Sequence, residues 1–371
     1  MPATERTHAV QIDDLTVSAY RVPTDEGLES DGTYAWDATT LVVVGVRGGG
    51  ISGMGYTYAD ESTATLIHST LADVVCGMDV MATGKIWTAL VAAVRNLGRP
   101  GVASMAISAI DVAVWDLKAR LLDLPLVTLL GGMREATPVY GSGGFTSYTE
   151  KARREQLSGW VESGITRVKM KVGRSAADDV RRVAAARDAI GDDAELFVDA
   201  NGAYDRKQAL AQAERFAESE VSWFEEPVYH RDLAGLRFCR EHAPASMEIS
   251  VGEYGYAPDS FAALIDAGAA DVLQADATRC EGITGLLIVD ALCEARSMPL
   301  STHCAPSLHA HVACAAKRVR HIEYFHDHAR IEHLLFDGAP TPRDGALHPD
   351  LGRRGLGLEL KYADARKYEL S

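Results

Sequence analysis

The sequence contains few cysteines, no paired cysteine motif and no long apolar segment. Its six cysteines are scattered among 371 residues without a C-x-x-C pair, which favours reduced thiols in a cytosol. No run reaches the roughly 18 apolar residues that a membrane helix needs. The amino-terminal stretch MPATERTHAVQIDD also lacks the apolar core of a signal peptide. We therefore expect a cytoplasmic protein with no membrane partner.

Basic tracts are absent as well. The formal net charge is −15, which argues against nucleic acid and anionic membranes as partners. No low-complexity segment and no short-period repeat appears. With 47% hydrophobic residues the chain can bury a substantial core, and its length predicts one barrel plus a smaller companion domain.

The amino-terminal part of the chain predicts a small α+β domain. Residues 9–22 and 38–58 alternate or cluster apolar residues around the Gly-rich GVRGGGISGMG, which predicts an antiparallel sheet. Residues 60–98 follow as helices. Between the two strand regions lies a polar loop, residues 21–37, whose length is typical of functional or disordered loops. Residues 104–126 are apolar nearly all round and predict a buried helix.

The rest of the chain alternates strand and helix patterns. Helical stretches such as residues 176–190 and 206–219 separate apolar strand candidates, and eight parallel strands favour closure into a barrel over an open sheet. After about residue 338 the chain is rich in Gly and Pro, which predicts an extended tail. The strand candidates end near Tyr140, Lys171, Asp199, Glu225, Glu253, Gln274, His303 and Glu323.

The predicted fold class is therefore α/β, with three parts. A small α+β domain is expected at residues 1–135, a (β/α) TIM-type barrel at residues 136–338 and a C-terminal segment at residues 339–371.

Polar side chains close seven apolar runs at a nearly constant interval. The steps between them are 20 to 28 residues, about the length of one strand, one helix and two loops. In a barrel every strand delivers its last side chain to one common mouth. The sequence therefore predicts an active site formed by Lys171, Asp199, Glu225, Glu253, Asp276, His303 and Glu323.

Three of these residues are carboxylates that end neighbouring strands, in LFVD, SWFE and SVGE. Asp199, Glu225 and Glu253 would repel one another unless a cation lay among them. Their oxygen atoms favour Mg²⁺, with Mn²⁺ as an alternative, over zinc, which prefers nitrogen and sulfur. A solvated or helix-capping carboxylate is the competing interpretation for any single one, but three in register predict a metal site. Glu226 has the opposite strand parity and is expected to face away.

Two lysines share one face of the strand RVKMKVG, residues 167–173. Inward ammonium groups at Lys169 and Lys171 need anionic partners, and each is expected to lower the pKa of the other towards the range of a working base. Solvated lysine tips are the alternative. That alternative fits poorly, because a barrel strand places apolar residues on both faces.

A histidine and two carboxylates complete the predicted ring. Asp276 beside His303 would fix the imidazole tautomer and raise its basicity, and Glu323 would act as an acid or hydrogen-bond donor. Cys304 follows His303 at the mouth, so a reactive thiol is an alternative there to the small core residue expected of most of the cysteines. Five more histidines resemble a metal cluster, but their helix and loop positions favour solvated or capping roles: His309, His311, His326, His328 and His333.

This set of motifs resembles the mandelate racemase subgroup of the enolase superfamily. The resemblance covers nearly the whole chain, and its specificity lies in the order and spacing of the motifs. They are the helix AIDVAVWDLKARLLDLPL, K-M-K at 169–171, VDANG at 198–202, EEP at 225–227, GE at 252–253, D-x(5)-GIT from Asp276, STH at 301–303 and GLGLEL at 355–360. The sequence departs from the pattern at Ala275 and Glu281, where many members carry Pro and Gly, and at Cys304.

The resemblance implies roles for the predicted residues. The three carboxylates would hold Mg²⁺, which binds the carboxylate of the substrate. Lys171 would be one acid/base group, and His303 paired with Asp276 the other. Lys169 would help to neutralise the substrate carboxylate, and Glu323 would hydrogen-bond the developing enediolate, whose charge must be met by preplaced cations and donors.

The resemblance also implies that residues 136–338 form a modified (β/α) TIM-type barrel as the catalytic domain. The N-terminal domain would cap this barrel, residues 339–371 would return to the capping domain, and residues 21–37 and 53–60 would lie near the distal end of the substrate. Their polar content favours a hydroxylated acid, so we expect an acid-sugar dehydratase, with a racemase, epimerase or cycloisomerase as the alternative. A silent metal-binding scaffold would not need both bases. Phosphate-binding barrel chemistry would need a Gly-rich loop where the chain has HCAPSLHAH and YFHDH. A homo-oligomer acting on a small molecule is implied by the same resemblance.

Overall fold

A computed structural model describes residues 9–370; residues 1–8, which belong to the stretch expected to lack a signal core, lie outside them. Its larger part is a closed barrel of parallel strands, in which each strand pairs with the next along the chain and the last pairs with the first. The predicted fold class is confirmed. The barrel strands are β6 (Thr137–Gly143), β7 (Arg167–Lys171), β8 (Glu195–Asp199), β9 (Val221–Glu225), β10 (Glu248–Val251), β11 (Val272–Ala275), β12 (Leu300–Thr302) and β13 (Val319–Phe325).

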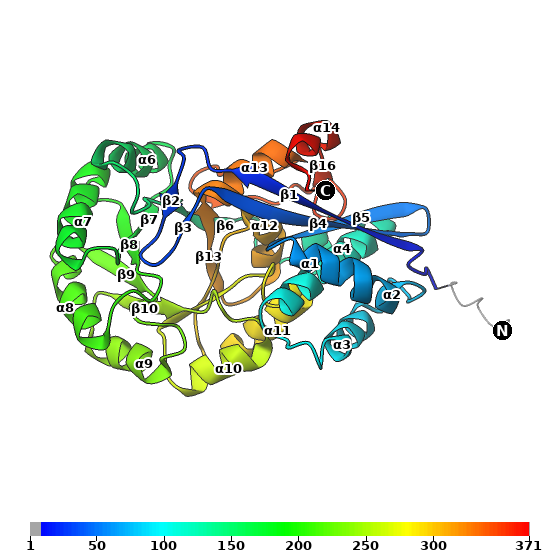
Figure 1. The fold of residues 1–371 in the computed structure, drawn as a ribbon, viewed down its shortest axis with the longest axis horizontal. Helices are drawn as coiled ribbons and strands as arrows, with labels where there is room; N and C mark the ends of the chain where they lie inside the picture. Colours follow the sequence, from blue (N-terminus) through cyan, green and yellow to red (C-terminus); the bar gives the residue numbers. More distant parts are fainter. Residues whose placement is uncertain (1–8, 371) are drawn as a thin grey trace.

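A helix follows each barrel strand and packs on the outside of the barrel (Figure 1). Local sequence explains several of the helix starts. Asp205 and Gln208 form a capping box at the start of α8, and the Thr149 side chain accepts a hydrogen bond at the start of α6. The helices are α6 (Glu150–Glu162), α7 (Ala176–Ile190), α8 (Arg206–Ala217), α9 (Leu233–His242), α10 (Pro258–Asp266), α11 (Gly282–Ala295), α12 (Pro306–Ala315) and α13 (His326–Leu335).

The N-terminal domain is an antiparallel sheet with helices packed beside it (Figure 1). Gly53 and Gly55 let the sheet approach the long buried helix α4, because a Cβ on either would lie 2.4 or 2.2 Å from the backbone of that helix. The sheet and the helices predicted from the sequence are thus confirmed. The elements are β1 (Asp14–Pro23), β4 (Ala38–Gly48), β5 (Ile51–Tyr58), α1 (Ser62–Leu66), η1 (Ile67–Leu71), α2 (Ala72–Val75), α3 (Thr83–Ala93), α4 (Val102–Leu121) and α5 (Leu126–Leu129).

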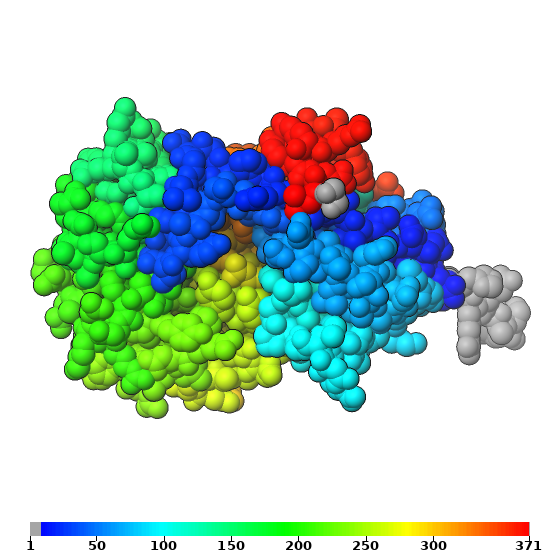
Figure 2. Space-filling model, viewed as in Figure 1, coloured from blue at the N-terminus to red at the C-terminus, as the bar shows by residue number. Residues whose placement is uncertain are grey.

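The polar loop between β1 and β4 forms an ordered cover over the barrel. Residues 24–37, here called the cap hairpin, contain the short strands β2 (Glu29–Ser30) and β3 (Ala35–Trp36). The space-filling view shows this blue segment lying against the green part of the barrel (Figure 2). Ser30 Oγ lies 2.7 Å from Thr146 Oγ1, and the Trp36 ring meets Phe145 edge-on at 5.4 Å.

The C-terminal tail contains short elements: β14 (Phe336–Asp337), β15 (Ala346–Leu347), β16 (Glu359–Leu360), α14 (Tyr362–Ala365) and η2 (Arg366–Tyr368). β15 pairs with barrel strand β6, while Leu370 N–H donates to Ala19 O of β1 at 2.8 Å. The tail therefore contacts both larger parts. The division of the chain at residues 135 and 338 stays a prediction.

Within residues 9–370, no helix combines the length and the apolarity that crossing a bilayer requires.

Candidate active site

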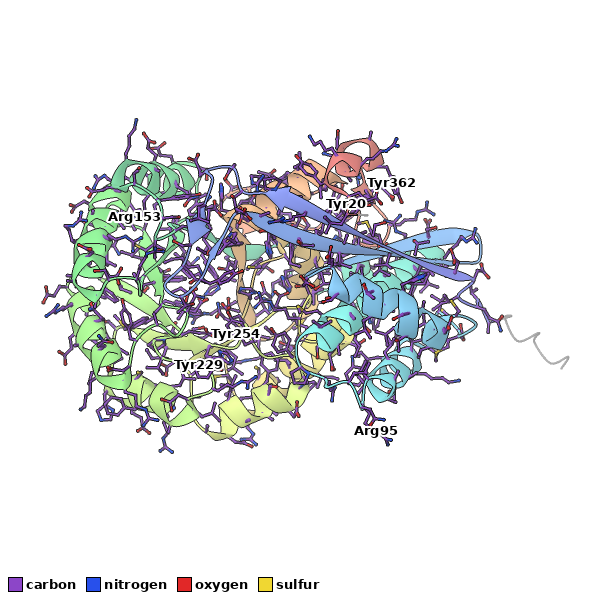
Figure 3. All side chains as sticks on the ribbon, viewed as in Figure 1. Tyr20, Arg95, Arg153, Tyr229, Tyr254 and Tyr362 are labelled. Carbon is purple, nitrogen blue, oxygen red and sulfur yellow. The ribbon has the colours of Figure 1, made fainter. Side chains whose placement is uncertain are left out.

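The predicted residues come together at the carboxyl ends of the barrel strands. A cavity of about 390 Å³ opens there, and Lys171, Glu253, His303 and Glu323 form part of its wall. Tyr254, labelled in Figure 3 near the middle of the barrel, borders the same cavity. The N-terminal domain supplies the opposite wall, with Asp31, Tyr34, Trp36, Thr39, Thr40, Tyr58 and Asp60 among its residues.

Strand register aligns the first members of the site. Lys171 of β7 lies opposite Asp199 of β8, and Asp199 lies opposite Glu225 of β9. Glu253 follows Gly252, whose φ of 140° and close approach to Gln274 exclude a side chain: a Cβ there would lie 2.2 Å from the Gln274 carbonyl oxygen. The position of Glu253 therefore depends on this glycine.

The three carboxylates form a compact, buried group, here called the carboxylate trio. Asp199, Glu225 and Glu253 each bring an oxygen to within 4.8 Å of the others. Trp223 Nε1 and Gln274 Nε2 donate to Glu225 Oε2 at 3.1 and 2.9 Å, whereas Glu253 Oε2 is buried without a hydrogen-bond partner. Burial and the charge of Asp199 raise the pKa of Glu225. An oxygen-only set with an unpartnered buried oxygen fits a hard divalent cation.

Each lysine is paired with carboxylates. Lys171 Nζ contacts Asp199 Oδ2, and Lys169 Nζ lies 2.6 Å from Glu225 Oε2 and 2.7 Å from Glu323 Oε1. Burial acts to lower the pKa of both lysines, but the surrounding carboxylates outweigh it and raise both pKa values above the usual range. The expectation that the two ammonium groups would lower each other's pKa towards that of a working base is therefore wrong for the protein alone. Lys169 does act in that direction on Lys171, but Asp199 has the larger effect.

His303 is oriented by Asp276. Its Nδ1 lies 2.8 Å from Asp276 Oδ2, while the N–H and the hydroxyl of Thr278 both donate to Asp276 Oδ1 at 2.7 Å. Burial opposes ionisation of Asp276, but the hydrogen bond to His303 and the charge of that residue lower its pKa. A proton on Nδ1 leaves Nε2 free as a base, 3.5 Å from Glu253 Oε2.

Glu323 accepts hydrogen bonds in this arrangement. Its Oε1 pairs with Lys169, and its Oε2 accepts from the Cys304 N–H at 2.9 Å. Although burial opposes ionisation, Lys169 and His303 lower the pKa of Glu323 well below its usual range. Glu323 could act as the expected hydrogen-bond donor only if its carboxyl were protonated, and the positive charges of Lys169 and His303 oppose that protonation.

The cysteines are mostly core residues, as expected: all except Cys76 are buried. At Cys304, burial and the charge of Glu323 raise the pKa of the thiol. The group is therefore a neutral thiol in the protein alone, and a spontaneously reactive thiolate is not supported.

Three of the five histidines are not solvated, although His311 does take a capping role, since its Nδ1 accepts from the Val127 N–H in the first turn of α5 at 3.3 Å. His309, His311 and His328 are buried, because α12 and α13 turn these residues towards the interior. His309 Nδ1 pairs with Cys304 O at 2.7 Å, and the His328 ring stacks on Tyr58 with centroids 3.3 Å apart. They are packing and hydrogen-bonding residues that support the site.

Sequence reasoning missed Arg279, although it lies inside the D-x(5)-GIT motif. Its Nη1 donates to Glu253 O at 3.1 Å, and its guanidinium lies 5.5 Å from the centre of the Tyr254 ring. Arg279 therefore supports the strand end that carries Glu253. Glu226, expected to face away, borders a separate cavity of about 220 Å³ beside Tyr254.

A second group of titratable side chains, which sequence reasoning also missed, joins the cap hairpin to α13. Asp25, Glu29, His326 and Asp327, here called the cap cluster, each bring one atom to within 4.8 Å of the others. Trp36 Nε1 donates to Asp327 Oδ2 at 3.1 Å. Burial and the charge of Asp327 raise the pKa of Glu29 to about 9. No sequence signal links these residues, because the two segments lie at opposite ends of the chain.

Known protein families match both the N-terminal domain and the barrel of this chain. Residues 30–131 match the model of the mandelate racemase / muconate lactonizing enzyme N-terminal domain, and residues 152–365 match the enolase C-terminal domain-like model. The L-talarate/galactarate dehydratase of Salmonella typhimurium is 33% identical over 87% of this chain and 80% of its own length. The 3,6-anhydro-alpha-L-galactonate cycloisomerase of Streptomyces coelicolor is 31% identical over 94% of this chain and 98% of its own.

Solved structures agree with these matches. A mandelate racemase/muconate lactonizing enzyme-like protein from Rubrobacter xylanophilus superposes with a TM-score of 0.95 at 53% identity, covering 97% of this chain and all of that one. A racemase from Streptomyces coelicolor A3(2) with bound magnesium superposes with a TM-score of 0.91 at 28% identity, with 97% and 100% covered. The similarity extends over both the barrel and the N-terminal domain.

Proposed function

Because the chain belongs to the mandelate racemase and muconate lactonizing enzyme family of the enolase superfamily, we propose that it is a magnesium-dependent enzyme that dehydrates a hydroxylated carboxylic acid. The reaction would begin with removal of the α-proton of a sugar acid and end with loss of a β-hydroxyl as water. The observation that carries the proposal is the presence of a basic side chain at each end of the carboxylate trio. Lys171 contacts Asp199, and His303 Nε2 lies 3.5 Å from Glu253 Oε2.

The carboxylate trio and Lys169 would bind the substrate carboxylate. Asp199, Glu225 and Glu253 would hold Mg²⁺, which supplies positive charge for the oxygens of that carboxylate. The ammonium of Lys169 is fixed between Glu225 and Glu323 and stays charged. It would add a second positive charge where negative charge develops on the enediolate.

The proton transfers fall to the two basic residues. Lys171 Nζ is held charged by Asp199 in the protein alone, and it would accept the α-proton as a neutral amine once Mg²⁺ on the trio takes over the charge of Asp199. His303 Nε2 would donate a proton to the departing β-hydroxyl, and the Asp276 carboxylate would stabilise the imidazolium that makes this donation. The leaving group departs as water only if it is protonated, so an acid on the far side of the substrate from Lys171 suits an elimination.

The side chains that the N-terminal domain contributes to the cavity wall favour a hydroxylated substrate. Thr39, Thr40 and Asp60 offer hydroxyl and carboxylate groups to the cavity, and such groups pair with sugar hydroxyls. The matched dehydratase acts on acid sugars by its name, which agrees in substrate class.

A racemase, epimerase or cycloisomerase is the second candidate. The same pair of bases can remove a proton from one face of the enediolate and return it to the other, and the matched cycloisomerase covers nearly the full length of both chains. Dehydration is preferred because the cavity wall from the N-terminal domain offers Thr39, Thr40 and Asp60 beside its aromatic side chains.

A substrate screen tests the choice. The Mg²⁺-loaded protein would be incubated with a stereochemical library of aldonic and aldaric acids, and keto products would be detected with semicarbazide. We expect a 2-keto-3-deoxy acid from the best substrate. A best substrate that changes optical rotation without a keto product would replace dehydration by the second candidate.

A further inference from the structure

Cys304 places a sulfur atom between two residues of the proposed site. His303 Nε2 lies 3.3 Å from Cys304 Sγ, Cys304 Sγ lies 3.5 Å from Glu323 Oε2, and Glu323 Oε2 lies 3.9 Å from His303 Nε2. A tetrahedral zinc ion bound at its usual ligand distances separates nitrogen, sulfur and oxygen ligands by about 3.4–3.6 Å. The three atoms therefore already form a triangle close to one face of such a tetrahedron.

The backbone takes an unusual conformation to place that sulfur. Cys304 and Ala305 have φ of 52° and 42°, the left-handed region that residues with a Cβ rarely adopt. Two hydrogen bonds hold the turn. The Cys304 N–H donates to Glu323 Oε2, and the Ala305 N–H donates to His328 Nδ1 at 3.3 Å. Strain of this kind is typical of functional positions.

The other atoms of the two flanking ligands are held by hydrogen bonds and ion pairs. His303 Nδ1 is bonded to Asp276, which leaves Nε2 as the ligating atom, and Glu323 Oε1 is paired with Lys169. Outer partners of this kind orient metal ligands and tune their basicity. His303, Cys304 and Glu323 all border the 390 Å³ cavity, so a fourth ligand position can open to solvent.

We propose that His303, Cys304 and Glu323 form a second metal site, selective for a thiophilic divalent cation such as Zn²⁺. Mg²⁺ prefers an all-oxygen set and belongs to the carboxylate trio, whereas sulfur and imidazole select softer ions. The thiol binds as a thiolate, and its proton passes to solvent when the cation arrives.

Occupation of this site has a functional consequence, which rests on the proposed function. A cation on His303 Nε2 takes the electron pair that the acid/base role needs. Zn²⁺ is therefore expected to inhibit the Mg²⁺-loaded enzyme, and relatives with a residue other than cysteine after the histidine would lack this inhibition.

Cobalt provides a readout of the site that does not depend on turnover. The full chain, saturated with Mg²⁺ to fill the carboxylate trio, would be titrated with Co²⁺ while the near-ultraviolet thiolate-to-cobalt charge-transfer band is followed. We expect one equivalent to bind with this band, and Zn²⁺ to remove it. Cys304→Ala should abolish the band, while Cys76→Ala, which removes the exposed cysteine, should keep it.

Glu323→Gln provides a second test that keeps the cysteine, and it should weaken Co²⁺ binding at least about tenfold. Circular dichroism would establish that each variant is folded. The site is refuted if the wild-type protein gives no band, or if the band survives in Cys304→Ala. If Zn²⁺ displaces cobalt from the wild-type protein and leaves turnover unchanged, the metal site stands and the acid/base role of His303 is overturned.

Discussion

The protein contains two crowded groups of acidic side chains, and it neutralises them differently. In the carboxylate trio, Asp199 and Glu225 are paired with Lys171 and Lys169. In the cap cluster, Asp25 is paired with His326 and Arg330, but the pKa of Glu29 rises to about 9 through burial and the charge of Asp327. Asp199 and Glu225 are thus compensated by lysines, whereas Glu29 is compensated by a proton.

This difference separates acidic groups that can take part in catalysis from acidic groups that stabilise the fold. Carboxylates paired with lysines, such as Asp199, whose pKa Lys171 lowers although burial opposes it, can exchange those partners for a metal ion and a substrate. A carboxyl kept protonated cannot hold a hard cation well, but it can share its proton with a neighbouring carboxylate. Glu29 Oε2 and Asp327 Oδ1 are both buried without a hydrogen-bond partner, and a proton on Glu29 gives the cap hairpin a donor at its contact with α13.

The largest effect should follow from breaking the trio. Glu225→Gln removes one negative charge from the metal site and should lower turnover at least about 10⁴-fold, because metal-ion stabilisation of the reacting charge is worth several kcal/mol. Turnover and Mg²⁺ binding by calorimetry would both be measured. Glu214→Gln, on the exposed face of α8, is the matched control and should behave like the wild-type protein. Full activity of the protein in the presence of a chelator would refute a metal-assisted reaction.

The next effect separates the two bases. His303→Asn should lower net turnover by about 10²–10⁴-fold, the usual contribution of a general acid or base. Lys171 should still exchange the α-proton of one stereoisomer with solvent deuterium, which NMR would detect. Lys171→Ala should lose that exchange. Turnover of both variants at the wild-type rate would mean that neither residue is a base.

The two groups also differ in how far the sequence could predict them. The trio, the lysines and the His303–Asp276 pair were expected to meet because parallel strands of a barrel end at one mouth, and the structure brings them together. The raised pKa values of Lys169 and Lys171 were not expected, since they depend on how many carboxylates surround each ammonium in three dimensions.

The cap cluster could not be predicted from the sequence pattern, for a different reason. Trp36 and Asp327 are 291 residues apart and belong to a hairpin and a helix start with no shared period. The burial of His309, His311 and His328 was likewise missed, because the groups that contact them are remote in sequence: the Ala277 N–H, the Val127 N–H and the Tyr58 ring, respectively. Periodicity predicts strand ends well and contacts between domains poorly.

A smaller effect concerns stability and tests the proton in the cap cluster. Because the pKa of Glu29 is raised in the folded state, the folded protein binds a proton that the unfolded chain has released between about pH 4.5 and 9. The contribution of Glu29 to the free energy of unfolding should therefore be fully present below that window and fall as the pH rises through it. Glu29→Gln keeps a neutral side chain and should lessen this fall by at least about 1.4 kcal/mol, the equivalent of one pKa unit. Urea unfolding at pH 5.5 and pH 9 measures it, with Glu26→Gln as a control on the exposed part of the hairpin. An equal pH dependence in Glu29→Gln and wild type would mean that Glu29 is ionised in the folded protein.

The smallest effect should come from the bond that links the cap cluster to the cavity. Trp36→Phe removes the Nε1 donor to Asp327 but keeps an aromatic ring against Phe145. Because one buried hydrogen bond is worth about 1 kcal/mol, the cap hairpin should open more often and KM should rise about fivefold, with kcat little changed. Such a split indicates that the hairpin supplies binding and that the trio and the two bases supply chemistry. Leu28→Ala, at an exposed position of the same hairpin, leaves the Asp327 contact intact and should give wild-type kinetics. A fall in kcat with constant KM in Trp36→Phe would instead place the cap cluster among the groups that act in the transition state, and the contrast between the two acidic groups would no longer hold.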